Sequence, residues 1–297
     1  MHLTRQGEAV RFDGYFINLD RSQDRRKSME TQLASIGYQD RIVRFPAVDG
    51  IAQGPFDNAG KNCVWACRQS HERVILNSSA DTATVVLEDD VELSPLFPTL
   101  INDQILAAHI GNNPDLDLMF LDCAPVFDRV SLLLLEAEKR MNGRANPQLL
   151  GDGRHYFDNV SLFDARATYA FCAAAYVVTP KGKQKLRTLY SASEDQAVPV
   201  DMLFRHWLHF DGLSGQLVVP FLATPEYMSA STISYDALDA PVIDQTVGLA
   251  IGAIRRLLFA GDANLDTNRI DALIEAGPRS PEYKLGLELA AAMMRAS

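Results

Sequence analysis

Two long apolar runs constrain the fold of this chain more than any other feature of its sequence. They are LDLMFLD at residues 116–122 and YAFCAAAYVVT at residues 169–179, and both are nearly continuous. Runs of this kind are typical of strands that are buried on both faces of a sheet. Because helices must then cover both faces, the runs predict an α/β protein.

The rest of the chain supplies strands and helices in alternation. The spacing and type of apolar residues predict strands at 15–20, 42–50 and 84–88, and helices at 22–36 and 61–78. This order favours an open, Rossmann-like sheet with helices on both faces.

Capping residues support two of the predicted helix ends. Gly37 follows the first predicted helix, where a C-capping glycine is expected. Thr179 precedes Pro180, which is the usual combination of an N-cap and a first helical residue. A helix is therefore predicted to begin at this point.

The pattern changes toward the C-terminus. Residues 1–240 are expected to form the main domain, and residues 241–297 a helical extension of three helices. The first of these, TVGLAIGAIRRLLFAG, is apolar enough to lie at a membrane surface, but Arg255 and Arg256 are its only positive charges. We expect it to pack against the main domain or a second subunit instead. Residues 142–159, rich in Gly, Asn and Asp, are predicted to be a long surface loop.

The charge balance argues against a polyanionic partner. The chain has 28 Lys and Arg against 38 Asp and Glu, a formal net charge of -10. Such a surface repels nucleic acid and anionic lipid. No apolar run approaches the roughly 18 residues of a membrane span, and no secretory leader pattern opens the sequence. We expect a cytoplasmic protein. Two further possibilities stay open: peripheral contact at the inner face of a membrane, and a homo-oligomer formed through the C-terminal helices.

The four cysteines are too few for a disulfide scaffold in 297 residues. Cys63 and Cys67 lie four apart on a predicted helix, which could be half of a metal site. No second Cys or His pair at zinc spacing accompanies them. The better interpretation is two small buried hydrophobes on one helix face.

The segment VVLEDDVEL at residues 85–93 places Glu88, Asp89 and Asp90 together at the end of a predicted buried strand. In an extended chain, Glu88 and Asp90 point to one side and Asp89 to the other. Carboxylates that repel one another are accommodated by a divalent cation, and oxygen ligands select Mn²⁺ or Mg²⁺. The segment therefore predicts a metal at Glu88 and Asp90, which in turn would hold a diphosphate.

Three other kinds of segment share an apolar strand that ends in acidic residues. A Walker B strand looks similar, but it requires G-x-x-x-x-G-K-[ST], which the sequence lacks. A receiver domain carries its acidic pair after the first strand rather than deep in the chain. A solvated acidic turn without function stays open on this motif alone.

Four ordered blocks resemble glycosyltransferase family 25, which includes bacterial lipopolysaccharide β-galactosyltransferases and collagen galactosyltransferases. The blocks are YFINLDRSQDRRKSMETQLASIGYQDRIVRFPAVDG, ACRQSHERVI, VVLEDDVELSP, and YVVTPKGKQKL with VPVDMLF, which together extend over roughly the first 235 residues. Ala66 departs from the glycine that the family usually has before the cysteine. The resemblance implies a GT-A type fold and inverting transfer of galactose, or sometimes glucose, from a UDP-sugar with a divalent metal. The acceptor stays open between lipopolysaccharide or another surface polysaccharide and a protein side chain.

The resemblance also suggests residues for the donor site. These are Asn18, Asp20, Arg21, Arg25, Asp49, His71 and Asp89. Arg25 is placed to reach the diphosphate by a charge-assisted hydrogen bond. Asp49 binds ribose or uracil, or forms an ordinary Asx turn. His71 either supports the acidic segment or touches the donor.

Inverting transfer needs a base that stands apart from the metal. Asp201, at the start of a predicted helix in a matched block, is the first choice. The alternatives are Glu194, Asp195 and Glu226.

Three further residues carry weaker expectations. His206 or His209 could approach the metal from the helix after the predicted base. Trp207 is expected in the core, with sugar stacking as the lesser option.

Two rivals to an active transferase stay open. One is a silent relative that binds a nucleotide sugar or glycan without transferring it, and the other is a scaffold built on the C-terminal helices.

Overall fold

The computed structural model describes residues 10–125, 133–136, 160–169, 171–225, 245–261 and 288. The first half contains β1 (Phe12–Asn18), α1 (Gln23–Ser35), β2 (Ile42–Pro46), α2 (Gly50–Gln53), α3 (Ala59–Asn77), β3 (Ala83–Glu88), β4 (Val91–Leu93), α4 (Phe97–Leu100), α5 (Asp103–Asn112) and β5 (Leu118–Phe120). The second half contains β6 (Ser161–Asp164), α8 (Ala165–Thr168), β7 (Ala175–Val178), α9 (Pro180–Ala192), α10 (Val200–His209), β8 (Gly215–Val219), β9 (Ala223–Pro225) and α11 (Gln245–Leu258).

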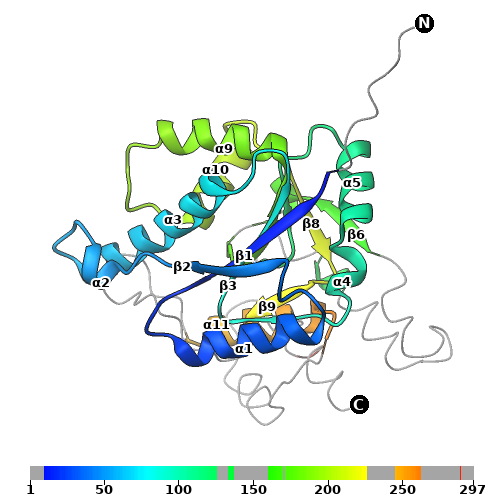
Figure 1. Ribbon diagram of the computed structural model, residues 1–297, viewed down its shortest axis with the longest axis horizontal. Helices are drawn as coiled ribbons and strands as arrows, with labels where there is room; N and C mark the ends of the chain where they lie inside the picture. Colours follow the sequence, from blue (N-terminus) through cyan, green and yellow to red (C-terminus); the bar gives the residue numbers. More distant parts are fainter. Residues whose placement is uncertain are drawn as a thin grey trace, which may run out of the picture.

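A seven-stranded mixed sheet forms the centre of the molecule, in the order β2-β1-β3-β7-β5-β8-β6. Strands β2, β1, β3, β5 and β8 run in one direction, while β7 and β6 run against their neighbours. Helices cover the sheet, as Figure 1 shows. The predicted α/β class is confirmed, and the architecture is compatible with a Rossmann-like fold. A separate pair, β4 and β9, forms a small antiparallel sheet.

The two faces of the sheet carry separate hydrophobic clusters. In β3, Val86 belongs to one cluster, and Val85 and Leu87 belong to the other, as the alternation of a strand requires. The first cluster packs against α3, α9 and α10, and the second against α1, α4 and α5. Both faces of β3 are therefore dry, which explains its unbroken apolar sequence.

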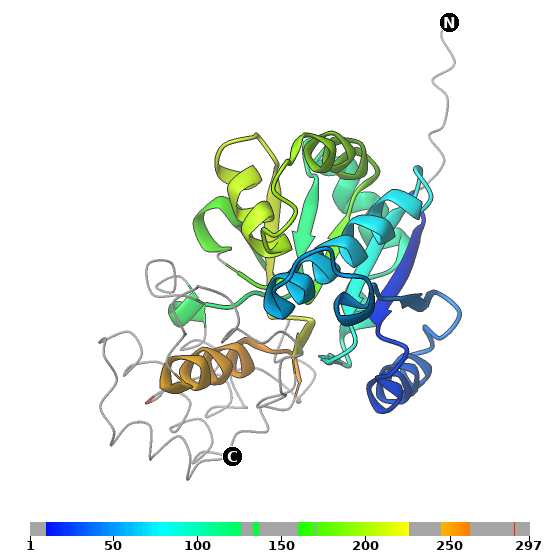
Figure 2. The same cartoon turned by 90° about the vertical axis from the view of Figure 1, so that its left-hand side faces the viewer.

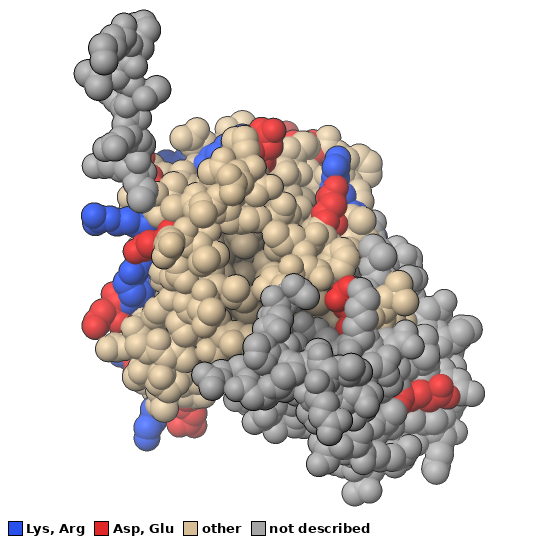
Figure 3. All heavy atoms as spheres, turned by 90° about the vertical axis from the view of Figure 1, so that its right-hand side faces the viewer, with Lys and Arg blue, Asp and Glu red and all other residues tan. Residues whose placement is uncertain are grey.

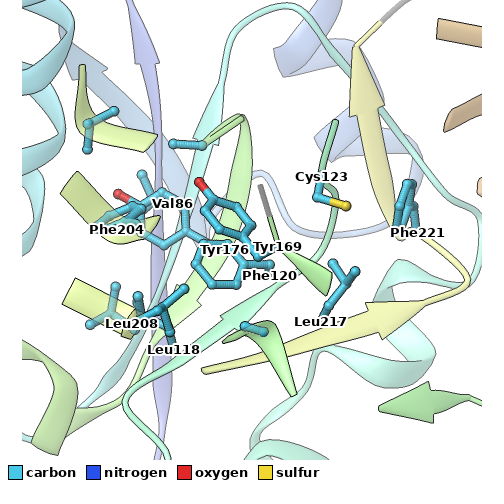
Figure 4. Close-up of a cluster of buried hydrophobic side chains, with 14 of the residues drawn as sticks. Val86, Leu118, Phe120, Cys123, Tyr169, Tyr176, Phe204, Leu208, Leu217 and Phe221 are labelled. Carbon is cyan, nitrogen blue, oxygen red and sulfur yellow. The ribbon is translucent and has the colours of Figure 1, made fainter. Parts of the chain in front are cut away.

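Aromatic rings fill the first cluster. Phe120 stacks on Tyr169 with ring centroids 3.9 Å apart, and Tyr176 and Phe204 pack beside them (Figure 4). Trp207 meets Tyr190 edge to face in the same cluster. The expectation that Trp207 is a core residue is confirmed.

The second apolar run forms a shorter strand than predicted. Residues 169–179 were expected to be extended, but β7 covers only Ala175–Val178. Cys172 adopts a φ of 82°, in the left-handed region, which ends any regular strand at that point. The apolar composition of the run does not reveal this left-handed residue.

Both predicted helix signals are confirmed. Thr179 accepts a hydrogen bond from the Gly182 N–H at 2.9 Å, so its side chain caps α9, and Pro180 is the first helical residue. Gly37, which follows the C-cap residue Ile36 of α1, has a φ of 75°, the conformation that a helix C-terminus often needs.

Helix α11 lies beside β9, as Figure 1 shows, and Figure 2 gives the same helix in orange from a second side. Its residues Ile254, Leu257 and Leu258 are buried in the first hydrophobic cluster, and Phe259 pairs in a bridge with Phe221. The expectation that the first C-terminal helix packs on the main domain is met. The predicted boundary at 240, the loop at 142–159 and most of the other two C-terminal helices lie outside the described residues.

None of the described helices combines the length and apolar character that a membrane crossing needs.

Candidate functional site: an acidic cleft at one edge of the sheet

The carboxyl ends of neighbouring strands bring polar residues to one edge of the sheet. Strands β1 and β3 are parallel partners, with Ile17 opposite Glu88, so Asn18 and Glu88 reach the same edge. Asp122 follows β5, which points the same way. Ligands of open α/β sheets bind at this edge.

The acidic segment turns instead of continuing as a strand. Strand β3 ends at Glu88, Asp89 and Asp90 form a turn, and β4 then runs back to pair with β9. The prediction that Asp89 and Asp90 point to opposite sides is therefore wrong, since Arg25 contacts both carboxylates and all three acidic residues line one cleft. The strand alternation behind that prediction does not apply within a turn.

The cleft has a cavity volume of about 120 Å³ and is open to solvent at its mouth. Its walls come from the end of β1, the start of α1, α3 and the acidic turn. Sites for small molecules occupy roughly 300–1,000 Å³, so the cavity is smaller than a typical site of that kind.

Arg25 and Asn18 hold the acidic turn from the β1 side. The Arg25 guanidinium lies 3.1 Å from Asp89 Oδ1 and 3.4 Å from Asp90 Oδ2. Asn18 donates from Nδ2 to Asp89 Oδ2 at 2.6 Å, and its own Oδ1 accepts from Arg44 Nε at 2.8 Å. Arg25 was expected to meet a diphosphate, and here it partly neutralises the carboxylates that would surround one.

Asp90 is the most perturbed acid of the cleft. Burial and the charge of Glu88 raise the pKa of Asp90 to about 7, while Arg25 opposes the rise. Its Oδ1 is buried and has no hydrogen-bond partner within the described part of the chain. A buried acceptor without a partner is the position that a cation or a proton would stabilise.

His71 faces the acidic turn from α3. Its Nε2 lies 3.2 Å from Glu88 Oε1, and its Nδ1 lies 2.9 Å from the Tyr176 hydroxyl. The ring is almost fully buried and stacks against Tyr176. Of the two roles expected for His71, support of the acidic segment is the one that these contacts show.

Cys67 is the residue of the cleft that the sequence interpretation missed. Its Sγ, a ring nitrogen of His71 and a carboxylate oxygen of Glu88 lie within 4.8 Å of one another. Burial and the nearby charge of Glu88 raise the pKa of the Cys67 thiol. The spacing of four between Cys67 and His71 was the available signal, because it places both on one helix face.

Three residues that were predicted to bind the nucleotide lie at the rim of the cleft. Arg21 is ion-paired with Asp49, and Asp20 is highly exposed and paired with Arg44. Asp49 also caps α2 by accepting from the Ile51 N–H at 2.9 Å. The Asx-turn interpretation of Asp49 is thus met, whereas binding of a nucleotide by these residues stays a prediction.

Asp201 stands behind the cleft at the start of α10. Its carboxylate accepts from the N–H groups of Cys172, at 3.1 Å, and Met202, at 2.8 Å. Burial raises the pKa of Asp201, those N–H groups oppose the rise, and the charge of Glu88 adds to it. Asp201 is therefore an acid within electrostatic reach of Glu88 and separate from the acidic turn.

The other residues considered for catalysis lie elsewhere. Glu194 and Asp195 are exposed in the connection between α9 and α10, and Glu226 is outside the described residues. His206 pairs with Asp211, and His209 borders a second hollow beside β6 and β8. Neither histidine lines the acidic cleft.

Helix α11 reaches the same edge of the sheet through one buried ion pair. Arg255 binds both oxygens of Asp122 and lies 3.1 Å from Cys172 Sγ. Its positive charge also opposes the rise in the pKa of Asp90. The helix thus contributes charge near the cleft as well as hydrophobic packing.

Comparison with known proteins gives no family. No protein-family model matches the sequence, and no curated protein is significantly similar to it.

Proposed function

We propose that this chain is a metal-dependent inverting glycosyltransferase that moves a hexose, most simply galactose, from a UDP-sugar to a glycan acceptor. One observation carries the proposal. Glu88, Asp89 and Asp90 line an open cleft at the carboxyl edge of β1 and β3. The resemblance of the sequence blocks to glycosyltransferase family 25 supports the reaction class and a GT-A type arrangement.

The residues of the cleft fit a divalent metal. Asp90 Oδ1 is buried without a hydrogen-bond partner among the described residues, and Glu88 lies beside it in the lining. These two carboxylates would hold Mn²⁺ or Mg²⁺, which would offset the charge on the departing diphosphate. Arg25 stands next to that charge.

Asp201 is the proposed base. The acceptor hydroxyl oxygen forms a bond to the anomeric carbon, the bond from that carbon to the UDP oxygen breaks, and the hydroxyl proton passes to the Asp201 carboxylate. Burial raises the pKa of Asp201, which makes its carboxylate a stronger base than an exposed one. Its separation from the acidic turn leaves it free of the metal.

The first test is release of UDP from a panel of UDP-sugars, without acceptor, in Mn²⁺ and in chelator. Wild type should slowly hydrolyse one donor only with metal, and Asp90→Asn should lower that rate at least ~100-fold, because a lost metal ligand removes several kcal/mol of charge stabilisation. Asp115→Asn is the matched control, since Asp115 is exposed and pairs with Lys181 away from the cleft. Asp201→Asn should keep UDP binding and lose transfer once an acceptor is found.

Other outcomes count against the proposal. Metal-independent hydrolysis, or an Asp90→Asn variant as active as Asp115→Asn, would contradict the assigned site. Binding of UDP without turnover in any acceptor screen would favour the silent relative, and failure to bind UDP would remove the nucleotide-sugar proposal.

A further inference from the structure

The cluster of Cys67, His71 and Glu88 has a different ligand chemistry from the acidic turn beside it. It offers one sulfur, one imidazole nitrogen and one carboxylate oxygen, all within 4.8 Å of one another. Two of the groups lie one helical turn apart on α3, and the third arrives from the end of β3. The packing of α3 on the sheet therefore assembles the cluster.

The histidine of the cluster is held in a defined orientation. The Tyr176 hydroxyl lies 2.9 Å from His71 Nδ1, and the two rings stack with centroids 5.7 Å apart. Only Nε2 is then directed at Glu88. Metal-binding histidines commonly use one nitrogen for an outer hydrogen bond in this way and the other for the ion.

The three ligand types select a metal. Thiolate and imidazole favour Zn²⁺ and similar borderline ions, whereas Mg²⁺ and Mn²⁺ prefer sites made of oxygen. Three protein ligands leave a fourth position vacant, which is the arrangement of zinc sites that bind water or substrate. All three residues line the cleft, so that position would face it.

We propose that Cys67, His71 and Glu88 form a three-ligand site for Zn²⁺ or another borderline divalent ion, with its open position toward the cleft. On binding, the Cys67 thiol proton is released to solvent and the sulfur binds as thiolate. The proposal goes beyond the transfer reaction, because it depends on the cluster and not on any donor. Since Glu88 is shared, Zn²⁺ in this site competes with the Mn²⁺ or Mg²⁺ proposed at Glu88 and Asp90.

Cobalt titration of the full-length chain, stripped of metal, tests the site directly. Co²⁺ should bind one equivalent with thiolate-to-cobalt charge-transfer absorption, and Zn²⁺ should displace it while Mg²⁺ does not. Cys67→Ser should lose this absorption and bind Zn²⁺ at least ~10-fold more weakly, because the thiolate ligand is gone. Cys63→Ser is the matched control, since Cys63 lies one turn earlier on α3 and lines the same cleft.

A second variant protects the test against a folding defect in Cys67→Ser. Glu88→Gln should keep the thiolate absorption and lower Co²⁺ affinity at least ~10-fold, because an anionic ligand is replaced by a neutral one. The proposal is overturned if wild type shows no thiolate absorption, if Cys67→Ser keeps it, or if Glu88→Gln binds Co²⁺ as tightly as wild type.

The two proposals fail separately. The spectra need no nucleotide sugar, and Asp90→Asn should retain the cobalt absorption while it loses UDP-sugar hydrolysis. A cobalt site without hydrolysis leaves the zinc proposal standing alone. If UDP-sugar hydrolysis is found without a cobalt site, the zinc proposal fails and the metal proposed at Glu88 and Asp90 remains.

Discussion

Several ionisable side chains of this protein are buried, and burial disfavours their charged form. Lys183 is the clearest case outside the cleft. Its side chain is 1% exposed, and its ammonium donates to the Ser79 carbonyl at 2.6 Å and to Thr82 Oγ1 at 3.2 Å. Burial lowers the pKa of Lys183 from 10.5 to about 8, although Asp13 opposes the shift. As the pH rises, the folded state therefore loses this proton at a lower pH than the unfolded state does.

The lowered pKa of Lys183 predicts how stability responds to alkali. Between pH 8 and 10.5 the unfolded chain holds the proton and the folded chain does not, so the contribution of Lys183 to unfolding free energy rises with pH. Urea unfolding should show this rise in wild type relative to Lys183→Met. Lys181→Met is the control, because Lys181 is exposed and its pKa is raised. Equal slopes for wild type and Lys183→Met would contradict the assignment.

At the scale of elements, α9 depends on a very close approach to the start of β5. A Cβ added at Gly182 would lie 2.1 Å from the Asp117 carbonyl oxygen and 2.8 Å from the carbonyl carbon. Both are backbone atoms, so no side-chain rotation relieves the clash. The approach also lets the Thr179 N–H donate to the same carbonyl at 3.0 Å.

Gly182→Ala is expected to cost about 1–3 kcal/mol of unfolding free energy or more, because α9 must move away from β5. Gly111→Ala, in α5, is the matched control, since a Cβ there has no heavy atom within 4 Å. The control should stabilise by up to about 1 kcal/mol, as alanine favours a helix over glycine. Thermal or urea unfolding of both variants measures the difference, and a Gly182→Ala protein as stable as Gly111→Ala would refute the close contact.

The prediction of elements succeeded where local chemistry decides the outcome. The Thr179 cap and the C-terminal Gly37 depend on neighbours a few residues away, and both are as predicted. The left-handed Cys172 was missed, because its conformation depends on contacts from Asp201 and Tyr169. No pattern within an apolar run indicates such a turn.

At the scale of the whole molecule, α11 closes the core. Four side chains at its C-terminal end are each at most 2% exposed: Ile254, Leu257 and Leu258 of the helix, and Phe259 directly after it. Arg255 binds Asp122, which has no exposed surface, and Arg256 binds Glu92 at 2.6 Å. Removing the helix would expose apolar surface and leave a buried carboxylate without its cation.

A chain that ends at residue 240 should fail to unfold cooperatively. Each buried side chain of α11 contributes about 1.5–3 kcal/mol, and the lost partner of Asp122 costs about 3–5 kcal/mol more. That total is comparable with the whole stability of a typical protein, about 5–15 kcal/mol. A chain that ends at residue 261 keeps α11 and serves as control. Cooperative urea unfolding of the shorter chain, at the wild-type midpoint, would contradict this role for α11.

Acidic and basic side chains are mixed on one described face of the molecule. On the face drawn in Figure 3, Lys and Arg side chains stand beside Asp and Glu side chains at the margin, and the described surface shows no continuous basic patch there. The net charge of -10 adds a general repulsion.

The sequence by itself determined the α/β class, the buried strands and the position of the acidic segment at a strand end. These follow from hydrophobic periodicity and capping, which act between residues close along the chain. Only the tertiary structure decided which side chains meet. It turned Asp89 into the cleft with Asp90, brought Cys67 and His71 of α3 to Glu88, and paired Asp122 with Arg255 across 133 residues. Such contacts depend on strand order and on the packing of helices against the sheet, and no local pattern encodes either one.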